Sequence, residues 1–160
     1  MSNLIQVGMA DFKVVQAPDK LITAGLGSCI GICLCDKAAK IGGMAHIMLP
    51  SSERARANQN RAKFADTAIE DMIALMVKMG ASPKRITAKI AGGAQMFNIG
   101  NSEVMKIGER NAKAVVEILN KNNIPILAQD TGGNFGRTII FDTETGELLI
   151  RTIGLGERVI

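Results

Sequence analysis

Runs of apolar residues separated by glycine, proline and polar residues dominate the first third of the chain. Residues 4–15 have an extended pattern that is interrupted at Gly8. The segment 21–35 is apolar almost throughout, and a second apolar run covers 41–49 and ends at Pro50. Short apolar runs with turn residues at both ends are typical of buried strands. We therefore expect 21–35 and 41–49 to form paired strands.

The rest of the chain alternates helical and strand-like patterns. Apolar residues recur at helical spacing over 64–79, where Gly80 provides a natural C-terminal stop, and over 108–120. The apolar residues expected to point inward from the second helix are Val115, Val116, Ile118 and Leu119. Strands are predicted at 86–91 and 124–129, and a hairpin at 137–141 and 148–153. Strands interspersed with two helices predict a layered α/β or α+β fold with a mixed β-sheet.

Length and composition favour one globular domain. The chain has 160 residues, of which 47% are hydrophobic and 21% charged, so we expect a single domain spanning 1–160 with its own core. No segment approaches the ~20 apolar residues of a membrane span, and the first residues lack the features of a signal peptide. The three cysteines crowd into 29–35, which is a poor disulfide framework. These observations predict a cytoplasmic protein without membrane insertion.

The positive charge is mild and does not favour a nucleic-acid partner. The formal net charge is +4, and the most basic stretch contains Arg54, Arg56, Arg61 and Lys63. Surfaces that hold single-stranded nucleic acid usually add stacking aromatic residues, but the chain has no Trp or Tyr and no Phe within this stretch. A solvated loop explains the stretch, and attraction to an acidic protein partner remains an alternative.

Cys29 and His46 are the strongest candidates for chemistry. His46 is the only histidine, and a lone histidine in an apolar run is often a core residue. Cys29, however, follows the glycine-rich turn at 25–28, where the backbone can approach a ligand closely. A free thiol has a pKa of about 8.5, and a neighbouring imidazole is the usual means of activation. Cys33 and Cys35 fit the behaviour of small buried hydrophobes.

A third group should orient the imidazole. Thr23 is one candidate because we expect it on the same strand as Cys29 and its hydroxyl can accept or donate a hydrogen bond, although most strand threonines are simply strand formers. Ser28 and Asp130 are weaker alternatives. The turn around Gly27 and Ser28 supplies candidate backbone N–H groups for a developing oxyanion or for substrate contacts.

Two other kinds of site match the residues less well. A zinc site formed by the three cysteines and His46 has unusual ligand spacing, and the glycines of 25–31 do not match a dinucleotide fingerprint. The glycine-rich segments 92–97 and 132–137 follow predicted strands, and they are either site-lining loops or ordinary turns.

The residues resemble those of the CheD chemoreceptor glutamine deamidases. The matching segments follow one another along essentially the whole chain: 26–29, 44–50, 63–68, 89–94, 107–111 and 130–134. They include Leu26-Gly27-Ser28-Cys29 and Met44-Ala45-His46-Ile47-Met48-Leu49-Pro50.

The resemblance implies a function, a site and a fold. CheD-like proteins hydrolyse glutamine side chains on the cytoplasmic helices of bacterial chemoreceptors, giving glutamate and ammonia. The family's cysteine, histidine and threonine fall on Cys29, His46 and Thr23, and no cofactor or metal is implied. The implied fold is a three-layer α/β/α sandwich. The family also binds and stimulates the phosphatase CheC, so the alternative function is a regulatory partner of CheC with little amidase activity.

Overall fold

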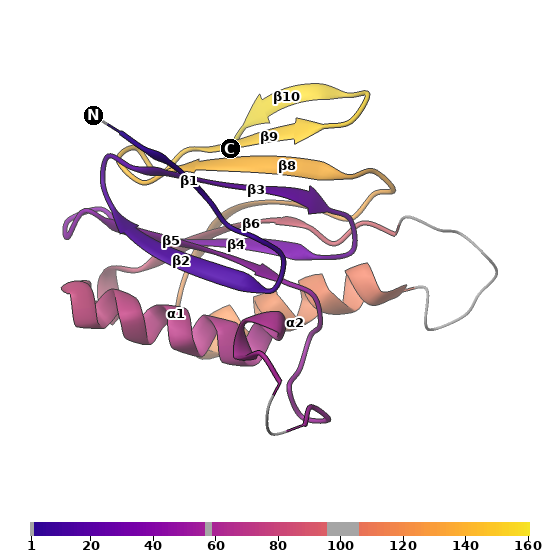
Figure 1. The fold of residues 1–160 in the computed structure, drawn as a ribbon, viewed down its shortest axis with the longest axis horizontal. Helices are drawn as coiled ribbons and strands as arrows, with labels where there is room; N and C mark the ends of the chain where they lie inside the picture. Colours follow the sequence, from indigo (N-terminus) through magenta and orange to yellow (C-terminus); the bar gives the residue numbers. More distant parts are fainter. Residues whose placement is uncertain (1, 57–58, 96–105) are drawn as a thin grey trace.

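Two β-sheets and a layer of helices make up the protein in the computed structural model, which describes residues 2–56, 59–95 and 106–160 (Figure 1). The strands are β1 (Leu4–Gln6), β2 (Asp11–Gln16), β3 (Lys20–Leu26), β4 (Ile30–Asp36), β5 (Ile41–Ile47), β6 (Thr87–Gly92), β7 (Ile126–Thr131), β8 (Arg137–Asp142), β9 (Leu148–Thr152) and β10 (Gly156–Val159). The helices of the described ranges are α1 (Ala65–Met79), α2 (Ile107–Lys121) and the short 3₁₀ turns η1 (Arg61–Lys63) and η2 (Pro83–Arg85). The mixed α and β composition predicted from the sequence is confirmed.

Within the described ranges, each sheet has five strands and mixes parallel and antiparallel pairs. The inner sheet has the order β2-β5-β4-β6-β7, with β6 and β7 parallel, and the outer sheet has the order β1-β3-β8-β9-β10, with β1 and β3 parallel. The inner sheet lies between the helices and the outer sheet (Figure 1). The prediction of a mixed sheet is confirmed, and the structure contains two such sheets.

The order of the layers differs from the expected α/β/α sandwich. Both α1 and α2 pack on one face of the inner sheet, and the outer sheet covers its other face. The physical reason lies in the C-terminal hairpin of β8 and β9, which pairs with β3 and presents Ile139, Phe141 and Ile150 to the inner sheet. A second sheet thus occupies the layer that a helix would fill, and the third layer consists of strands.

The apolar run 21–35 contains two strands instead of one. β3 belongs to the outer sheet, β4 belongs to the inner sheet, and a turn at 27–29 connects them. β4 pairs with β5 as predicted, whereas β3 pairs with β1 and β8. Hydrophobicity does not reveal the change of sheet because both strands face the same core and remain apolar across the turn.

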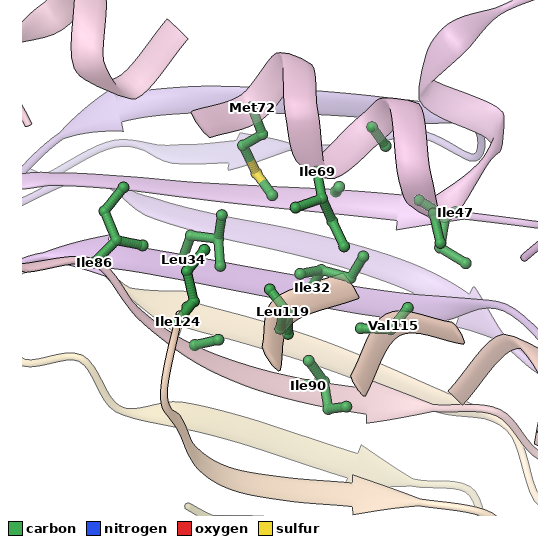
Figure 2. Packing of buried hydrophobic residues seen from close by; sticks show 14 of the residues in the cluster. Ile32, Leu34, Ile47, Ile69, Met72, Ile86, Ile90, Val115, Leu119 and Ile124 are labelled. Carbon is green, nitrogen blue, oxygen red and sulfur yellow. The ribbon is translucent and has the colours of Figure 1, made fainter. Parts of the chain in front are cut away.

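The central strands β4 and β5 are buried on both faces, which explains their almost unbroken apolar sequence. Figure 2 shows Ile32 and Leu34 of β4 facing Ile69 and Met72 of α1. Successive strand residues point to opposite faces, so Cys33 and Met44 project toward the outer sheet instead. This alternation also directs the candidate site residues into the space between the sheets.

The helices follow the predicted pattern closely. Gly80 ends α1 with φ 122°, and its N–H bonds to the carbonyls of Met76 and Val77. In α2, Val115 and Leu119 are buried, while Val116 and Ile118 are half-buried at the edge of the core. No helix in the described ranges is sufficiently long and apolar to cross a membrane.

Candidate active site

The candidate residues meet between the two sheets, at one end of β3, β4 and β5. Thr23 projects from β3, His46 from β5, and Cys29 lies in the turn immediately before β4. Thr23 and His46 are each 1% exposed, and Cys29 is 7% exposed. The thiol therefore lies just below the surface, with the other two side chains behind it in the core.

Strand register explains why Cys29 and His46 are neighbours. Gly31 pairs with His46 across the β4–β5 ladder, and Cys29 is two residues before Gly31. Side chains two residues apart share a face and reach diagonal neighbours across the ladder. Gly31 has no side chain, and Ile139 of the outer sheet packs closely against it. A Cβ added at Gly31 would lie only 2.4 Å from Ile139 Cδ1, so a larger residue would clash there.

Thr23 fixes the orientation and the tautomer of His46. The Thr23 Oγ1 atom lies 2.7 Å from His46 Nδ1 and 2.8 Å from the Val7 carbonyl oxygen. A carbonyl only accepts hydrogen bonds, so the single hydroxyl proton goes to Val7 and Nδ1–H must donate to Thr23. The other ring nitrogen, Nε2, is then the unprotonated one, and it is a buried atom without a hydrogen-bond partner among the described residues.

Burial keeps both the thiol and the imidazole neutral. Desolvation raises the pKa of the Cys29 thiol and lowers the pKa of His46. The resting pair is therefore a thiol beside a neutral base and not a thiolate–imidazolium ion pair. No hydrogen bond joins Sγ to Nε2 in the described residues, and catalytic pairs often tighten only when substrate binds.

The turn that carries Cys29 is held by its carbonyl groups. The Gly27 carbonyl accepts a 2.8 Å hydrogen bond from Ala94 N–H, and the Cys29 carbonyl accepts a 2.9 Å bond from Gly93 N–H. Between them, the Ser28 carbonyl accepts a 2.9 Å bond from Asn111 Nδ2. Three consecutive peptide groups are thereby fixed by residues distant in sequence.

The N–H groups of these peptides point away from the residues that hold the carbonyl groups, because the N–H and the carbonyl of a trans peptide point in opposite directions. In the described part of the chain, the backbone N–H groups of Ser28 and Cys29 donate no hydrogen bond. Gly27 differs, because its N–H is already used within the turn, bonding to the Gly25 carbonyl at 3.1 Å. Ser28 thus keeps the free donor expected of an oxyanion candidate, whereas Gly27 contributes backbone shape and not a free N–H.

Both glycine-rich segments support the site. At Gly92, φ is 117° and an added Cβ would lie 2.2 Å from the Cys29 carbonyl oxygen, so only glycine permits this close approach. Arg137, 2% exposed, donates to the carbonyls of Gly92 and Gly132 and pairs with Asp130 at 3.0 Å. Met96 and Phe97 of the first segment lie outside the described residues.

The alternative assignments have other partners. Asp130 binds Arg137 and Arg158, and its side chain is therefore occupied away from His46. Cys33 is fully buried in the core between the sheets, where burial raises the pKa of its thiol. Across the described ranges, no group of three His, Cys, Asp or Glu side chains converges to hold a metal ion.

The basic stretch is partly committed to a structural role. Arg61 pairs with Asp71 at 2.8 Å and with Glu70 at 3.1 Å, both on α1. This arrangement favours the solvated-loop interpretation for Arg61, because its charge is balanced within the chain.

Asn111 is the functional candidate that the sequence interpretation missed. It is fully buried on α2, and its amide bonds to carbonyls on both sides of the site. The available signal was helical spacing, because Asn111, Val115 and Leu119 form one stripe at intervals of four residues. A polar residue within an apolar stripe indicates a specific hydrogen-bonding role.

Similar proteins connect this geometry to a family. The model of the family described as CheD chemotactic sensory transduction matches residues 48–152. A Syntrophomonas wolfei protein named "Probable chemoreceptor glutamine deamidase CheD" is 64% identical over 100% of both chains. Proteins with the same name from Caldanaerobacter subterraneus and Desulfitobacterium hafniense are 56% and 55% identical, covering 99% and 100% of both chains respectively.

A more distant likeness appears among solved structures. A Neisseria meningitidis protein of the DUF152 family has a TM-score of 0.47 and 12% identity, over 83% of this chain and 62% of its own. The sequence relatives are far closer, and their matches cover 99% or more of this chain. By its family match and its full-length relatives, the chain belongs to the CheD family.

Proposed function

We propose that this protein is a glutamine deamidase that converts glutamine side chains of chemoreceptors into glutamate and ammonia through a thioester on Cys29. The observation that carries the proposal is the chain of contacts from Val7 through Thr23 to His46, which leaves Nε2 as the unprotonated ring nitrogen. The β4–β5 register places His46 opposite Gly31, two residues after Cys29. The full-length relatives named as probable chemoreceptor glutamine deamidases support the choice of substrate.

The reaction begins with proton transfer from Cys29 to His46. Nε2 takes the thiol proton while Sγ attacks the glutamine Cδ, so a C–S bond forms and the carbonyl π electrons move onto oxygen. The N–H groups of Ser28 and Cys29, which donate to no acceptor among the described residues, are suited to hold this oxyanion. The neutral resting pair favours this concerted general-base route, because the thiolate is not preformed.

Collapse of the tetrahedral intermediate releases ammonia. His46 returns the proton to the leaving nitrogen, the C–N bond breaks, and a thioester remains on Cys29. Water then gives a proton to Nε2 and attacks the thioester carbon, and the C–S bond breaks as Cys29 regains the proton. The products are glutamate and ammonia, and His46 ends in its starting tautomer.

Thr23 acts through His46 and does not touch the reacting atoms. By accepting from Nδ1–H, its hydroxyl keeps Nε2 as the base and stabilises the imidazolium formed during attack. In the proposal Cys29 is the nucleophile, His46 is the acid and base, and Thr23 is the orienting residue.

The proposed substrate is a glutamine on the cytoplasmic helices of a chemoreceptor, which assigns the protein to the cytoplasm. The family resemblance adds CheC as a proposed binding partner. A CheC-dependent regulatory role without deamidation is the alternative, and the two are separable because only the deamidase requires the Cys29 thiol.

Mass spectrometry of a receptor cytoplasmic fragment tests the proposal. Incubation with the wild-type protein is expected to convert particular glutamines to glutamate, and Cys29→Ala is expected to abolish conversion. Cys33→Ala is the matched control, because Cys33 faces the same core between the sheets but projects from β4, outside the turn that carries Cys29. Equal conversion by wild type and Cys29→Ala would overturn the proposal, as would no conversion by wild type; stimulation of CheC by an inactive wild type would instead favour the regulatory role.

A further inference from the structure

Asn111 connects three parts of the molecule at the candidate site. It lies in the second turn of α2 and is fully buried. Its Nδ2 group donates to the Ser28 carbonyl at 2.9 Å and to the Met48 carbonyl at 3.0 Å. Ser28 precedes the nucleophile, and Met48 lies two residues after His46, so one amide joins the Cys29 turn to the end of β5.

The bond to Ser28 determines where the next N–H points. The Ser28 carbonyl and the Cys29 N–H belong to one peptide group, which is planar and trans, so the two point in opposite directions. Asn111 holds the carbonyl toward α2. The Cys29 N–H must then face away from α2, which is consistent with the absence of an acceptor for it among the described residues.

The hydrogen bond from Asn111 to the Ser28 carbonyl also makes the Cys29 N–H a stronger donor. A peptide whose carbonyl accepts a hydrogen bond is polarised, which makes its N–H a better donor. Gly93 and Ala94 fix the peptide groups on either side of this one, and among the described residues only Asn111 bonds to the peptide that carries the Cys29 N–H.

Within the described residues, the two bonds from Nδ2 are the hydrogen bonds that the Asn111 side chain makes in the core. Its Oδ1 atom is buried and has no partner in the described part of the chain, although buried polar atoms are normally paired. An apolar residue would continue the stripe formed by Val115 and Leu119 without leaving Oδ1 unpaired. The two Nδ2 donors are therefore the reason for an amide at this position.

We propose that Asn111 is a positioning residue that sets the direction of the Cys29 N–H and so builds the oxyanion hole. The inference rests on the proposed deamidase function. Asn111 acts through the Ser28–Cys29 peptide and does not contact the substrate in this account.

Kinetic comparison of Asn111→Asp with wild type separates this role from a structural one. Aspartate keeps the size of the side chain but not its two Nδ2 donors. A carboxylate only accepts, and a protonated carboxyl has one donor for the two carbonyls of Ser28 and Met48, so the Ser28 carbonyl is no longer held as in the wild type. We expect kcat for deamidation of a receptor fragment to fall about 100-fold, the lower end of the loss on removing an oxyanion donor. KM is expected to change less than about twofold, because ground-state binding is not the affected step.

Alkylation of Cys29 by iodoacetamide provides the discriminating readout. Displacement of iodide forms no oxyanion, so the alkylation rate of Asn111→Asp is expected to stay within about threefold of wild type. If kcat and the alkylation rate fall together, the role of Asn111 is only to support the turn, and the inference is overturned. Unchanged kcat would also overturn it.

Two additions keep the test decisive. Val115→Ala, on the same buried stripe one turn later, is the control for general loosening of α2, and its kcat is expected to stay near the wild-type value. The Cys29 amide resonance in a ¹H–¹⁵N spectrum requires no activity, and it is expected to shift in Asn111→Asp but not in Val115→Ala. An unmoved resonance overturns the inference even if the wild type proves inactive, whereas inactivity of the wild type alone counts against the proposed function.

Discussion

The buried polar groups at the two ends of the central strands β4 and β5 differ in their hydrogen bonding. At the end of β4, Asp36 is fully buried, and its carboxylate accepts from Ser82 N–H at 2.8 Å and from Arg85 Nε at 3.0 Å. At the start of β4, His46 Nε2 and Asn111 Oδ1 are buried without partners among the described residues. We call the Asp36 end, where the buried carboxylate is fully hydrogen-bonded, the satisfied end. The unsatisfied end is the one with His46 and Asn111, where two buried polar atoms have no partner among the described residues.

This difference separates stability from function. Burial alone would raise the pKa of Asp36, but the hydrogen bonds and charge of Arg85, with the N–H groups of Ser82 and Ala39, hold its pKa below the ordinary range. Those contacts tie β4 to the segment after α1. Unpaired polar atoms at the other end do not stabilise the fold, and their chemistry is available to a substrate.

The largest expected effect is on activity at the unsatisfied end. His46→Gln is expected to lower kcat/KM for deamidation about 1,000-fold, within the range for loss of a general base. The neutral amide should leave the free energy of unfolding within about 1 kcal/mol of wild type, because His46 is not part of a stabilising ion pair. Steady-state kinetics and urea unfolding measure both quantities, and near-normal activity would remove His46 from the mechanism.

A smaller loss is expected when His46 is kept but its orienting partner is removed. Thr23→Val preserves the shape of the side chain and deletes the hydroxyl that accepts from Nδ1–H. Since the imidazole can then adopt the wrong tautomer, we expect kcat to fall about 10- to 100-fold with little change in KM. Thr23→Ser keeps the hydroxyl and is the matched control, so we expect it to deamidate the receptor fragment at close to the wild-type rate. Equal losses of kcat in both variants would argue against a role for the hydroxyl.

The satisfied end should show the reverse behaviour. Asp36→Asn removes the charge that Arg85 and the Ser82 N–H hold, and we expect a loss of about 2 kcal/mol in the free energy of unfolding. Because the folded-state pKa lies below the unfolded value of 3.8, the charge contributes stability above pH 3.8 that is lost as the pH falls through the folded-state pKa. Activity per folded molecule should be unchanged, and a matching loss of kcat would mean that the two ends are coupled.

The mildest effect concerns pH. Burial lowers the pKa of His46 from 6.5 and raises the pKa of Cys29 above 9.0, so the active neutral pair persists across that interval. We expect kcat/KM to stay nearly constant from pH 6.5 to 8, and its acid limb to fall below pH 6.5 as Nε2 becomes protonated. An acid midpoint above 6.5 would contradict the lowered pKa of His46, and a kcat/KM that falls on the alkaline side within this interval, as an imidazolium loses its proton, would indicate a preformed ion pair instead.

Local sequence patterns predicted much of the inner sheet and its helices. The β4–β5 pair, α1 and α2 have strong periodicity and clear turn residues, and Cys29 and His46 stood out as a thiol in a glycine-rich turn and the only histidine. These features depend on neighbouring residues, which the sequence displays directly.

The outer sheet and the supporting contacts could not be predicted in the same way. The chain changes sheet at the glycine-rich turn before Cys29, but the apolar residues on either side of that turn do not show which sheet each strand joins. β10 is exposed and short. Asn111 meets Ser28 across 83 positions, a pairing that depends on how α2 packs and not on any local pattern. Thr23 was weighted by family resemblance, and the structure supplies the 2.7 Å contact that gives it a physical role.

Stoichiometric labelling asks whether Cys29 alone, of the three buried cysteines, carries the chemistry. The protein is alkylated stepwise with iodoacetamide, the labelled cysteine is mapped by peptide mass spectrometry, and residual receptor deamidation is measured at each step. We predict that activity falls in proportion to label on Cys29 while Cys33 and Cys35, both in the core between the sheets, remain unlabelled. Full activity with Cys29 completely labelled, or lost activity with Cys29 unlabelled, would contradict the account.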